Sequence, residues 1–375
     1  MISDVARISY ERYISSTFSN VLVQPTTYCT ANCTYCYLPG RKNKNVMLGE
    51  VAEAVAASIA EQAAEHAVTI LWHSGEPLAT PIDQFMRLLQ PFESLRQEGR
   101  VQHNVQSNGM LIDEAWCDIF IEYEFSIGIS IDGPEQANAN RINWAGRPIF
   151  PQLQRGITML RERNIDFRAI CTVSPQTVHD PSALLSFFDE LGCREVGFNV
   201  EEIEGINVDR PHIDEAAVEE FWSGVVAHQI AGTGVQVREV QNITDYLTLA
   251  RAGQKQKWLD ARHEPGPAVS WDGRVVLMSP ELLGVTAPHH EDFVVGNILR
   301  ESIPSILARA HEVGYVSEFM QGLAGCESTC PFWSMCRGAH ASNRYFETGT
   351  FATTETAHCR NTRQAPTVAL AAALQ

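Results

Sequence analysis

The sequence predicts an α/β fold: a partial (β/α)6 TIM-like barrel followed by a C-terminal cysteine-rich domain. From residue 19 to about 230, short apolar runs alternate with longer amphipathic stretches, a pattern typical of parallel strands joined by helices. Three of the ten cysteines crowd into residues 29–36 and four into residues 326–359. The second group lies in a segment without this alternation, which indicates a separate C-terminal unit.

Each of six expected strands is followed by an expected helix. The strands are 20–24, 69–73, 101–105, 125–130, 167–173 and 195–200, and the helices are 49–66, 81–96, 113–122, 150–164, 181–191 and 213–230. Six such βα units suit an open barrel, although a flat doubly wound sheet fits the same pattern. In both arrangements, chemistry collects on the loops that follow the carboxyl ends of the strands.

The pattern becomes irregular after residue 230. A strand–turn–strand signal spans 269–278 around Asp272-Gly273, a helix is expected over 302–320, and a short apolar helix over 364–375 should pack back on the body. The expected organisation is a barrel over 1–230, a bridging region over 231–320 and a cysteine-rich domain over 321–375.

Charge and hydropathy exclude several classes of protein. The chain has 375 residues and a formal net charge of −17, which is unlike the basic footprint of a nucleic-acid-binding protein. No apolar run approaches the roughly 18 residues of a membrane span, and the N-terminus lacks the features of a signal peptide. We therefore expect a cytoplasmic protein with no nucleic-acid or membrane partner. In such a protein, cysteines indicate metal binding or catalysis rather than disulfides.

The first cysteine group, Cys29, Cys33 and Cys36, follows the first expected strand, with gaps of three and two residues. Three thiolates on one tight loop can hold three irons of a [4Fe-4S] cubane, and the fourth iron then stays open. The alternative is a zinc site, but zinc prefers four ligands in two separated pairs. The spacing, with Tyr35 just before the third cysteine, resembles the signature of radical S-adenosylmethionine (SAM) enzymes.

Further polar motifs follow the next strands. Ser74-Gly75-Glu76-Pro77 stands where radical SAM enzymes usually have Gly-Gly-Glu-Pro, and Ser107-Asn108-Gly109 and Ser130-Ile131-Asp132-Gly133-Pro134 follow the third and fourth strands. The resemblance implies that backbone around the first motif binds the SAM amino group, and that the other motifs lie near the SAM ribose, its carboxylate or the substrate. The residues implied for cofactor binding are Tyr35, Ser74, Gly75, Glu76, Asn108, Ser130, Asp132 and Asn199.

The second cysteine group has gaps of three, five and twenty-two residues and consists of Cys326, Cys330, Cys336 and Cys359. Four thiolates can hold another cubane or a structural zinc ion. The segment resembles a shortened SPASM domain, the C-terminal module of many radical SAM peptide-modifying enzymes. The full module carries two auxiliary clusters, but the residues after the expected hairpin, 275–279, contain no cysteine. The resemblance therefore implies one auxiliary [4Fe-4S] cluster.

Within this family, the chain is similar to the enzymes that build three-residue cyclophanes in ribosomally made peptides. The segments that carry this similarity are 197–205, 279–284, 296–297, 343–351 and 354–356. Two segments depart from the family pattern: the loop 135–141 is one residue short and lacks a His-Asp pair, and 337–340 reads Arg-Gly-Ala-His. If these segments face the substrate, a different substrate is expected.

The resemblance implies that SAM is cleaved reductively to a 5′-deoxyadenosyl radical, with electrons from a donor such as flavodoxin or ferredoxin. That radical would take hydrogen from a side-chain Cβ of a precursor peptide, and the carbon radical would add to an aromatic ring. Loss of a proton then requires a base, for which Glu281, Glu201 and Glu202 are candidates. Two alternatives stay open: radical modification of a small-molecule intermediate, and a non-enzymatic iron–sulfur electron carrier.

Overall fold

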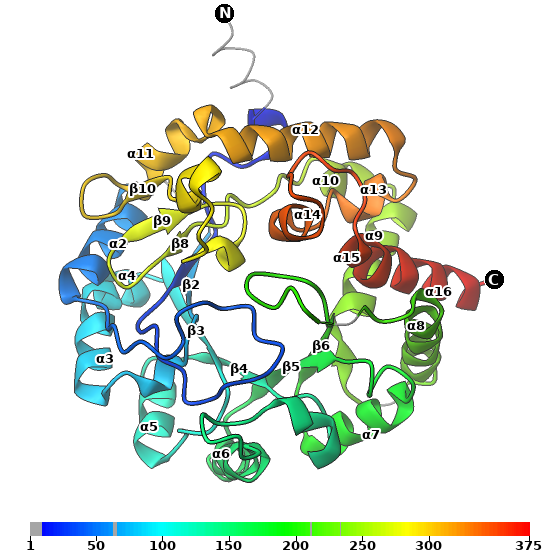
Figure 1. The fold of residues 1–375 in the computed structure, drawn as a ribbon, viewed down its shortest axis with the longest axis horizontal. Coiled ribbons are helices and arrows are strands. Elements are labelled where there is room, and N and C mark those ends of the chain that lie inside the picture. Colours follow the sequence, from blue (N-terminus) through cyan, green and yellow to red (C-terminus); the bar gives the residue numbers. More distant parts are fainter. Residues whose placement is uncertain (1–9, 63–65, 211, 233) are drawn as a thin grey trace, which may run out of the picture.

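The fold is a curved sheet with helices around its outside (Figure 1). The computed structural model describes residues 10–62, 66–210, 212–232 and 234–375. Its sheet has ten strands in the order β10-β9-β8-β1-β2-β3-β4-β5-β6-β7. The six expected strands are confirmed as β1 Asn20–Val23, β2 Val68–Trp72, β3 Val101–Ser107, β4 Ser126–Ser130, β5 Phe167–Val173 and β6 Glu195–Val200.

These six strands pair in parallel with their sequence neighbours. A doubly wound sheet would reverse its strand order at a switch point, so the uninterrupted order from β1 to β6 identifies the partial barrel instead. In β3 and β5, buried residues alternate with more exposed ones, as the two faces of a strand require.

The helices between the strands lie close to their expected positions. They are α2 Gly49–Glu61, α3 Ile82–Leu89, α4 Glu93–Gln97, α5 Glu114–Glu122, α6 Phe150–Glu162, α7 Pro181–Leu191 and α8 Glu215–Ile230. The expected helix over 81–96 is broken by the 3-10 turn η2 Gln90–Phe92, because Pro91 has no N–H to donate. The expected helix over 49–66 ends at Glu61, and residues 63–65 lie outside the described part of the chain.

The bridging region extends the sheet at both ends. β7 Gln236–Val237 pairs in parallel with β6, and β8 Ala268–Val269 pairs in parallel with β1. The expected hairpin is confirmed, since β8 pairs antiparallel with β9 Arg274–Val276, which pairs with β10 Gly296–Asn297. Two helices, α9 Arg238–Arg251 and α10 Lys255–Leu259, precede the hairpin.

The expected single helix over 302–320 is wrong. The structure has α11 Ile303–Ala308, the turn η6 Ala310–Glu312 and then α12 Gly314–Thr329, which continues past Cys326. Val313 is extended (φ −76°, ψ 125°) and Gly314 follows it, so two poor helix formers coincide with the break. The remaining elements are α13 Trp333–Cys336, α14 Ala341–Thr348, α15 Ala357–Cys359, the π-helical turn η7 Arg360–Gln364 and α16 Ala365–Ala373.

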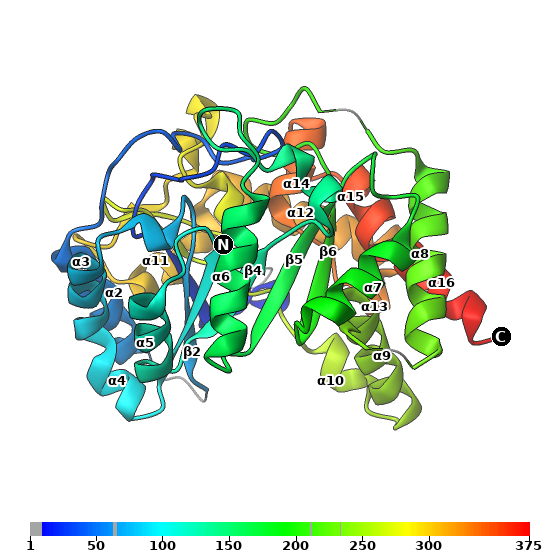
Figure 2. The same cartoon turned by 90° about the horizontal axis from the view of Figure 1, so that it is seen from below.

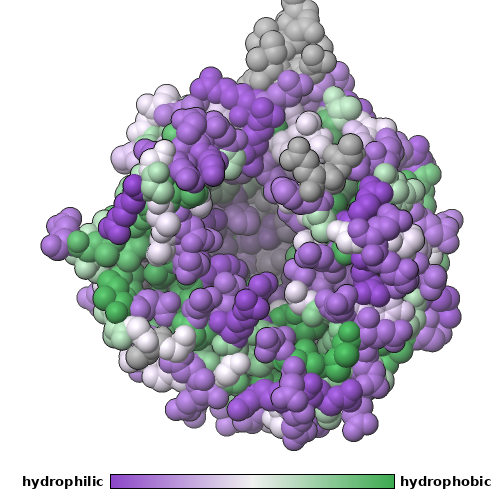
Figure 3. Space-filling view, turned by 180° about the vertical axis from the view of Figure 1, so that it is seen from behind, coloured by the Kyte–Doolittle hydropathy of each residue, from purple (hydrophilic) through white to green (hydrophobic). Residues whose placement is uncertain are grey.

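Short 3-10 turns occupy several of the loops: η1 Pro77–Ala79, η3 Glu135–Asn140, η4 Pro280–Leu282 and η5 Pro288–Phe293. Seen from the side opposite to Figure 1, the molecule is hollowed near its centre, and the residues around the hollow are largely hydrophilic (Figure 3). Among the helices in the described part of the chain, none combines the length and the apolar character that a membrane crossing requires.

The apolar helix expected at the C-terminus is confirmed as α16, which lies beside α8 (Figure 1). The link between this segment and the barrel includes Trp222 of α8, a fully buried side chain that packs edge-on against Phe198 and Phe221. Its Nε1 donates a hydrogen bond of 2.6 Å to the carbonyl oxygen of Asn361. A single indole thus joins the core of the barrel to the segment that follows Cys359.

We predict that Trp222→Phe lowers the free energy of unfolding by about 1–3 kcal/mol, because the buried carbonyl of Asn361 loses its donor. Urea denaturation followed by circular dichroism measures this loss. Trp271→Phe is the matched control, since its indole N–H has no hydrogen-bond partner among the described residues. Equal losses in the two variants would contradict the assigned role of the indole.

Candidate functional site

A cavity of about 590 Å³ lies at the carboxyl ends of the strands and is lined by side chains from the barrel and from the C-terminal segment. The loop after β1, which carries the first cysteine group, crosses one end of the strands (Figure 2). The loop after β6 and residues near α14 and α15 form another part of the wall. The cavity therefore joins regions that are far apart in the sequence.

The three cysteines of the first group, Cys29, Cys33 and Cys36, all line this cavity. Burial raises the pKa of Cys29 and raises that of Cys33 to about 11, while the charge of Arg141 opposes the shift at Cys33. The amide Nδ2 of Asn108 lies 3.7 Å from the sulfur of Cys29. Buried thiols next to a donor and a cation form an environment that suits a thiolate-bound cluster.

Among the described residues, no group of three or more Cys, His, Asp or Glu side chains is arranged to hold a single metal ion. In a [4Fe-4S] cubane, by contrast, each cysteine binds a different iron.

The Ser74-Gly75-Glu76 turn packs against the cysteine loop. Ser74 and Gly75 both have positive φ angles, 68° and 80°, and a Cβ on Gly75 would lie 2.5 Å from the carbonyl oxygen of Thr26. Only glycine fits this close approach. The backbone N–H of Glu76 donates to the carbonyl of Tyr28 over 2.8 Å. The turn is therefore fixed directly beside the loop that carries Cys29.

The Glu76 carboxylate is buried, and its hydrogen bonds go to the protein itself. It accepts hydrogen bonds from the Ser107 hydroxyl (2.8 Å) and from the backbone N–H groups of Asn108 (2.7 Å) and Leu78 (3.1 Å). Burial raises its pKa to about 7, against the opposing effect of these donors. Glu76 thus ties the motif after β2 to the motif after β3, a contact that its place in the sequence motif does not reveal.

Asp132, expected from the sequence near SAM or the substrate, has all its acceptor positions filled. Its two oxygens accept from Arg141 Nε (2.9 Å) and Nη2 (2.8 Å), from the Tyr35 hydroxyl (2.7 Å) and from the Thr172 backbone N–H (2.9 Å). A carboxylate has about four such positions. The contacts therefore assign Asp132 to holding Tyr35 and Arg141, two side chains that line the cavity.

The remaining residues implied for cofactor binding also line the cavity. Ser130 accepts a hydrogen bond from Gln106 Nε2 over 2.9 Å, and Asn199 accepts one from Arg238 Nη2 over 2.9 Å. Tyr35 lies with its ring 5.5 Å from the Arg141 guanidinium carbon, and burial raises its pKa well above the usual value. Of the whole set, Ser74 and Asp132 do not line the cavity.

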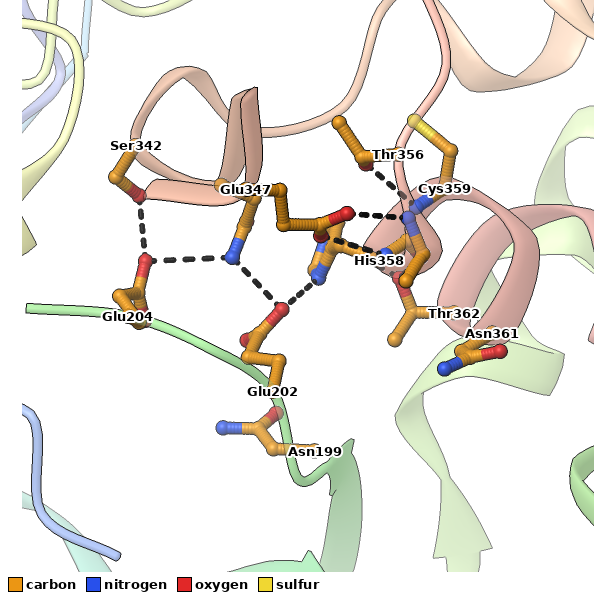
Figure 4. A network of polar contacts seen from close by, with 12 residues as sticks. Asn199, Glu202, Glu204, Ser342, Glu347, Thr356, His358, Cys359, Asn361 and Thr362 are labelled. Atoms are coloured by element: carbon orange, nitrogen blue, oxygen red, sulfur yellow. Dashed lines mark hydrogen bonds and ion pairs between the residues drawn. The ribbon is translucent and has the colours of Figure 1, made fainter. Parts of the chain in front are cut away.

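One part of the cavity wall is acidic, because the structure brings Glu201, Glu202 and Glu281 together with a fourth carboxylate, Glu204. The Glu202 carboxylate accepts from Asn343 Nδ2 (2.7 Å), and its Oε2 lies 2.6 Å from His358 Nδ1 (Figure 4). Glu204 accepts from the Ser342 hydroxyl over 2.6 Å. These contacts bind the loop after β6 to α14 and α15.

The carboxylates in this acidic part of the wall differ in their hydrogen-bond and ion-pair partners. Glu201 forms a short ion pair with Arg210 through Oε1, while its Oε2 is buried without a hydrogen-bond partner. The Oε2 of Glu281 is likewise buried and without a partner. Burial, together with the negative charge of Glu202, raises the pKa of Glu281 to about 7. Burial and the neighbouring Glu281 and Glu202 raise the pKa of Glu204 well above its usual range.

Sequence reasoning did not select Glu204, His358, Asn343 or Arg141 as site residues. Glu204 stands two positions after Glu202, and His358 immediately precedes Cys359, so both were within segments already singled out. The roles of Glu204 and His358 depend on contacts with residues more than 130 positions away, such as the contact between Glu204 and Ser342, which are 138 positions apart. The signal available in the sequence was the clustering of carboxylates after the sixth strand.

The second cysteine group surrounds a smaller cavity, which all four sulfur-bearing side chains line together with Arg363. α12 carries Cys326, α13 carries Cys336 and α15 carries Cys359. Arg363 also lines the large cavity. Arg363 therefore lies between the two cavities and forms part of the wall of each.

A buried cation beside this cavity supports an anionic occupant. Arg344 is only 1% exposed, and its Nη2 lies 3.4 Å from the sulfur of Cys326. It donates to the carbonyls of Gly338 and Thr353, has no carboxylate among its described partners, and leaves its Nε without an acceptor. Burying a guanidinium without a compensating charge is costly. Thiolates bound to a metal centre would supply that charge, for a cubane and for zinc alike.

Comparison with known proteins identifies relatives of this architecture. Residues 23–204 match the family described as the Radical SAM superfamily. An uncharacterised protein of Synechocystis is 31% identical over 356 residues, covering 91% of this chain and 88% of that protein. A serine-type anaerobic sulfatase-maturating enzyme of Bacteroides thetaiotaomicron is 27% identical over 48% of this chain and 45% of its own length. The alignment thus spans about half of that enzyme.

Solved structures share the fold at low sequence identity. The structure of anSMEcpe with bound AdoMet has a TM-score of 0.76 at 18% identity and covers 95% of this chain and 97% of that one. Streptococcus suis SuiB bound to the precursor peptide SuiA has a TM-score of 0.67 at 14% identity and covers 95% and 78%. These similarities support the overall fold, the partial barrel included, over almost the whole chain.

The raised pKa of Glu281 leads to a prediction about stability and pH. The folded protein keeps a proton that the unfolded chain releases between pH 4.5 and about 7. The contribution of this group is therefore fully present below pH 4.5 and is lost as the pH rises to about 7, by about 1–3 kcal/mol. Glu281→Gln should flatten this part of the pH profile, as measured by urea denaturation from about pH 4 to about pH 8. Glu53→Gln on the exposed face of α2 is the control, and an unchanged slope in Glu281→Gln would refute the shift.

Proposed function

Because the chain belongs to the radical SAM superfamily, we propose that it crosslinks a side-chain Cβ to an aromatic ring in a ribosomally made peptide. The observation that carries this proposal is the large cavity, whose wall combines the three cysteines of the first group, a group of carboxylates and Arg363, which also lines the cavity of the second cysteine group. A crosslinking reaction needs a hydrogen-abstracting centre, a proton acceptor and an electron acceptor around one substrate. The cavity offers a residue set for each.

The first cysteine group would hold a [4Fe-4S] cluster with an open iron, which, with SAM bound, supplies a 5′-deoxyadenosyl radical. The protein's own task is to place and shield the reacting groups. The backbone of the Ser74–Glu76 turn is held beside Cys29 and is suited to the SAM amino group. Asn108, Ser130 and Asn199 would offer polar contacts to the rest of SAM from neighbouring strand ends.

Tyr35 and Arg141 would complete the wall on the SAM side. Asp132 fixes both side chains by hydrogen bonds of 2.7–2.9 Å, so it acts as a positioning residue. A guanidinium fixed in this way can face a carboxylate of the ligand without rearranging. The role of Asp132 in this proposal is therefore indirect.

Glu281 is the best candidate for the base that removes the ring proton. Its Oε2 faces no partner, and its pKa of about 7 matches the requirement for a base near neutral pH. Glu201 is already paired with Arg210, and Glu202 is bound to Asn343 and close to His358. These two carboxylates would instead shape the cavity and hold α14 and α15 in place.

The four cysteines of the second group would hold one auxiliary [4Fe-4S] cluster, which could accept the electron released when the ring regains aromaticity. The buried Arg344 fits an anionic centre at this position. A peptide substrate is supported by relatives whose structures contain peptides, namely anSMEcpe with the Cp18Cys peptide and SuiB with SuiA. The cyclophane product is supported by the sequence segments that resemble cyclophane-forming enzymes.

The small-molecule alternative loses part of its support. The departure at 135–141 was its main motivation, but of these residues only Arg141 lines the cavity. Asn138 is buried and binds the backbone of the same loop, at Gly133 O and Pro134 O. Asn140 of the same loop binds Thr34 of the cysteine loop, so most of this loop packs against the protein. In the second departing segment, 337–340, His340 lines the cavity, so a substrate difference at that segment stays open.

The test is to incubate the anaerobically reconstituted, reduced protein with SAM and a short aromatic-rich peptide encoded beside its gene. We expect the peptide to lose two hydrogens, with 5′-deoxyadenosine formed alongside, as read by high-resolution mass spectrometry. Cys33→Ala should abolish both products, whereas Cys336→Ala should keep deoxyadenosine and lose the crosslink. Deoxyadenosine with an unchanged peptide would reject that peptide and favour a small molecule.

Removing the proposed base should separate the two halves of the reaction. We expect Glu281→Gln to lower the rate of crosslink formation by about 10²–10⁴-fold, because general-base catalysis contributes about this much. Deoxyadenosine formation in the same samples should stay within about two-fold of wild type, since the proposed base acts only after SAM has been cleaved. Glu281→Asp should recover part of the rate, and a crosslinking rate unaffected by Glu281→Gln would remove it from the mechanism.

A further inference from the structure

A second large cavity, of about 630 Å³, lies outside the site described above. It is a groove bordered by the N-terminal segment, α10 and the segment after it, α12 and α13, and its wall includes Arg12, Tyr13, Arg262, Trp333 and Arg337. α10 and the loop that carries the first cysteine group lie at opposite sides of the molecule in Figure 2. A partner at this groove would leave the substrate cavity accessible.

One aromatic side chain connects the groove to the second cysteine group. Trp333 lines both the groove and the cavity surrounded by the four cysteines. Its backbone N–H donates to the carbonyl of Cys330 over 3.1 Å, and α13 carries both Trp333 and Cys336. On the groove side, Tyr13 packs edge-on at 6.2 Å. A partner bound in the groove would therefore be separated from these cysteines by the side chain of Trp333.

The groove carries more positive than negative charge on an acidic protein. Its wall has three arginines, Arg12, Arg262 and Arg337, against Asp260 and Glu327, whereas the whole chain has a net charge of −17. Arg12 is paired with Glu327 at 2.8 Å, and the Arg337 guanidinium lies 4.3 Å from the Trp333 ring centre. Arg262 is exposed and forms no ion pair within the described residues. Such a patch would attract an acidic surface.

We propose that this groove binds a small acidic one-electron carrier protein of the flavodoxin or ferredoxin type. The inference rests on the proposed function, because it requires a redox-active cluster on the second cysteine group. The oxidised carrier would take up one electron that the auxiliary cluster gives up after each crosslink, so the carrier is reduced by one electron and the cluster is oxidised by one. Trp333 would provide the contact between the two proteins.

The first measurement is the affinity of oxidised flavodoxin for the reconstituted holoenzyme, by isothermal titration calorimetry at two ionic strengths. We expect Arg262→Glu to weaken binding by about ten-fold at low salt, with a smaller effect at high salt, where charges are screened. Arg155→Glu on the exposed face of α6 makes the same charge change on a different part of the surface and should leave binding unchanged. Equal effects of the two substitutions on the affinity, or an affinity that does not change with ionic strength, would overturn the proposal.

A second measurement separates this inference from the proposed function. In the triple variant Cys29→Ala, Cys33→Ala and Cys36→Ala, only the second cysteine group can hold a cluster, which iron and sulfide analysis and electron paramagnetic resonance would verify. The reduced variant should pass an electron to oxidised flavodoxin, seen as semiquinone absorbance, and Arg262→Glu should slow this transfer about ten-fold at low salt. If the cluster forms but Arg262→Glu has no effect, the groove proposal fails. If no redox-active cluster forms, the auxiliary-cluster part of the proposed function fails as well.

Discussion

A buried carboxylate at the end of β4 holds the candidate site together. Asp132 is 1% exposed and accepts hydrogen bonds from Tyr35 on the cysteine loop, from Arg141 on the loop after β4 and from Thr172 on β5. Removing one partner of a buried ion pair typically costs about 3–5 kcal/mol, because the other charge is left uncompensated. The Asp132 carboxylate therefore links the cysteine loop to the ends of two strands, and its loss would disturb this part of the cavity wall. Glu76 makes a second link of the same kind, between the ends of β2 and β3.

The buried carboxylates around the cavity differ in how their charge is compensated. Beside the cysteine loop, Asp132 is paired with Arg141, which fixes the geometry of both groups, whereas Glu76 is held by neutral donors alone and burial raises its pKa to about 7. Beside α14 and α15, Glu204 and Glu281 have no arginine or lysine among their hydrogen-bond partners in the described part of the chain, and burial together with nearby carboxylates raises their pKa values. A buried carboxylate without a partner is costly to keep ionised. It therefore accepts a proton readily when the substrate releases one next to it. The proposal that Glu281 is the proton acceptor rests on this lack of a partner.

Much of the fold was predictable from the sequence because alternation of apolar runs and amphipathic stretches reports directly on βα units. All six barrel strands were predicted, and the structure places the first cysteine group on the loop after β1, as expected. The helix over 302–320 was wrong because the pattern does not show the extended backbone at Val313. The sequence also suggested Asp132 as a ligand contact, whereas three-dimensional packing gives it four protein donors. The pairing of Glu202 with His358, which are 156 positions apart, could not be read from spacing at all.

Crosslinking as proposed requires that hydrogen is removed from a peptide side chain inside the large cavity. The decisive measurement uses the peptide substrate with deuterium placed only at the Cβ of the residue to be crosslinked, followed by mass spectrometry of the released 5′-deoxyadenosine. The account predicts that deoxyadenosine gains one deuterium and that the crosslinked peptide loses it. Deoxyadenosine without deuterium, formed together with a peptide that keeps its full label, would contradict the account.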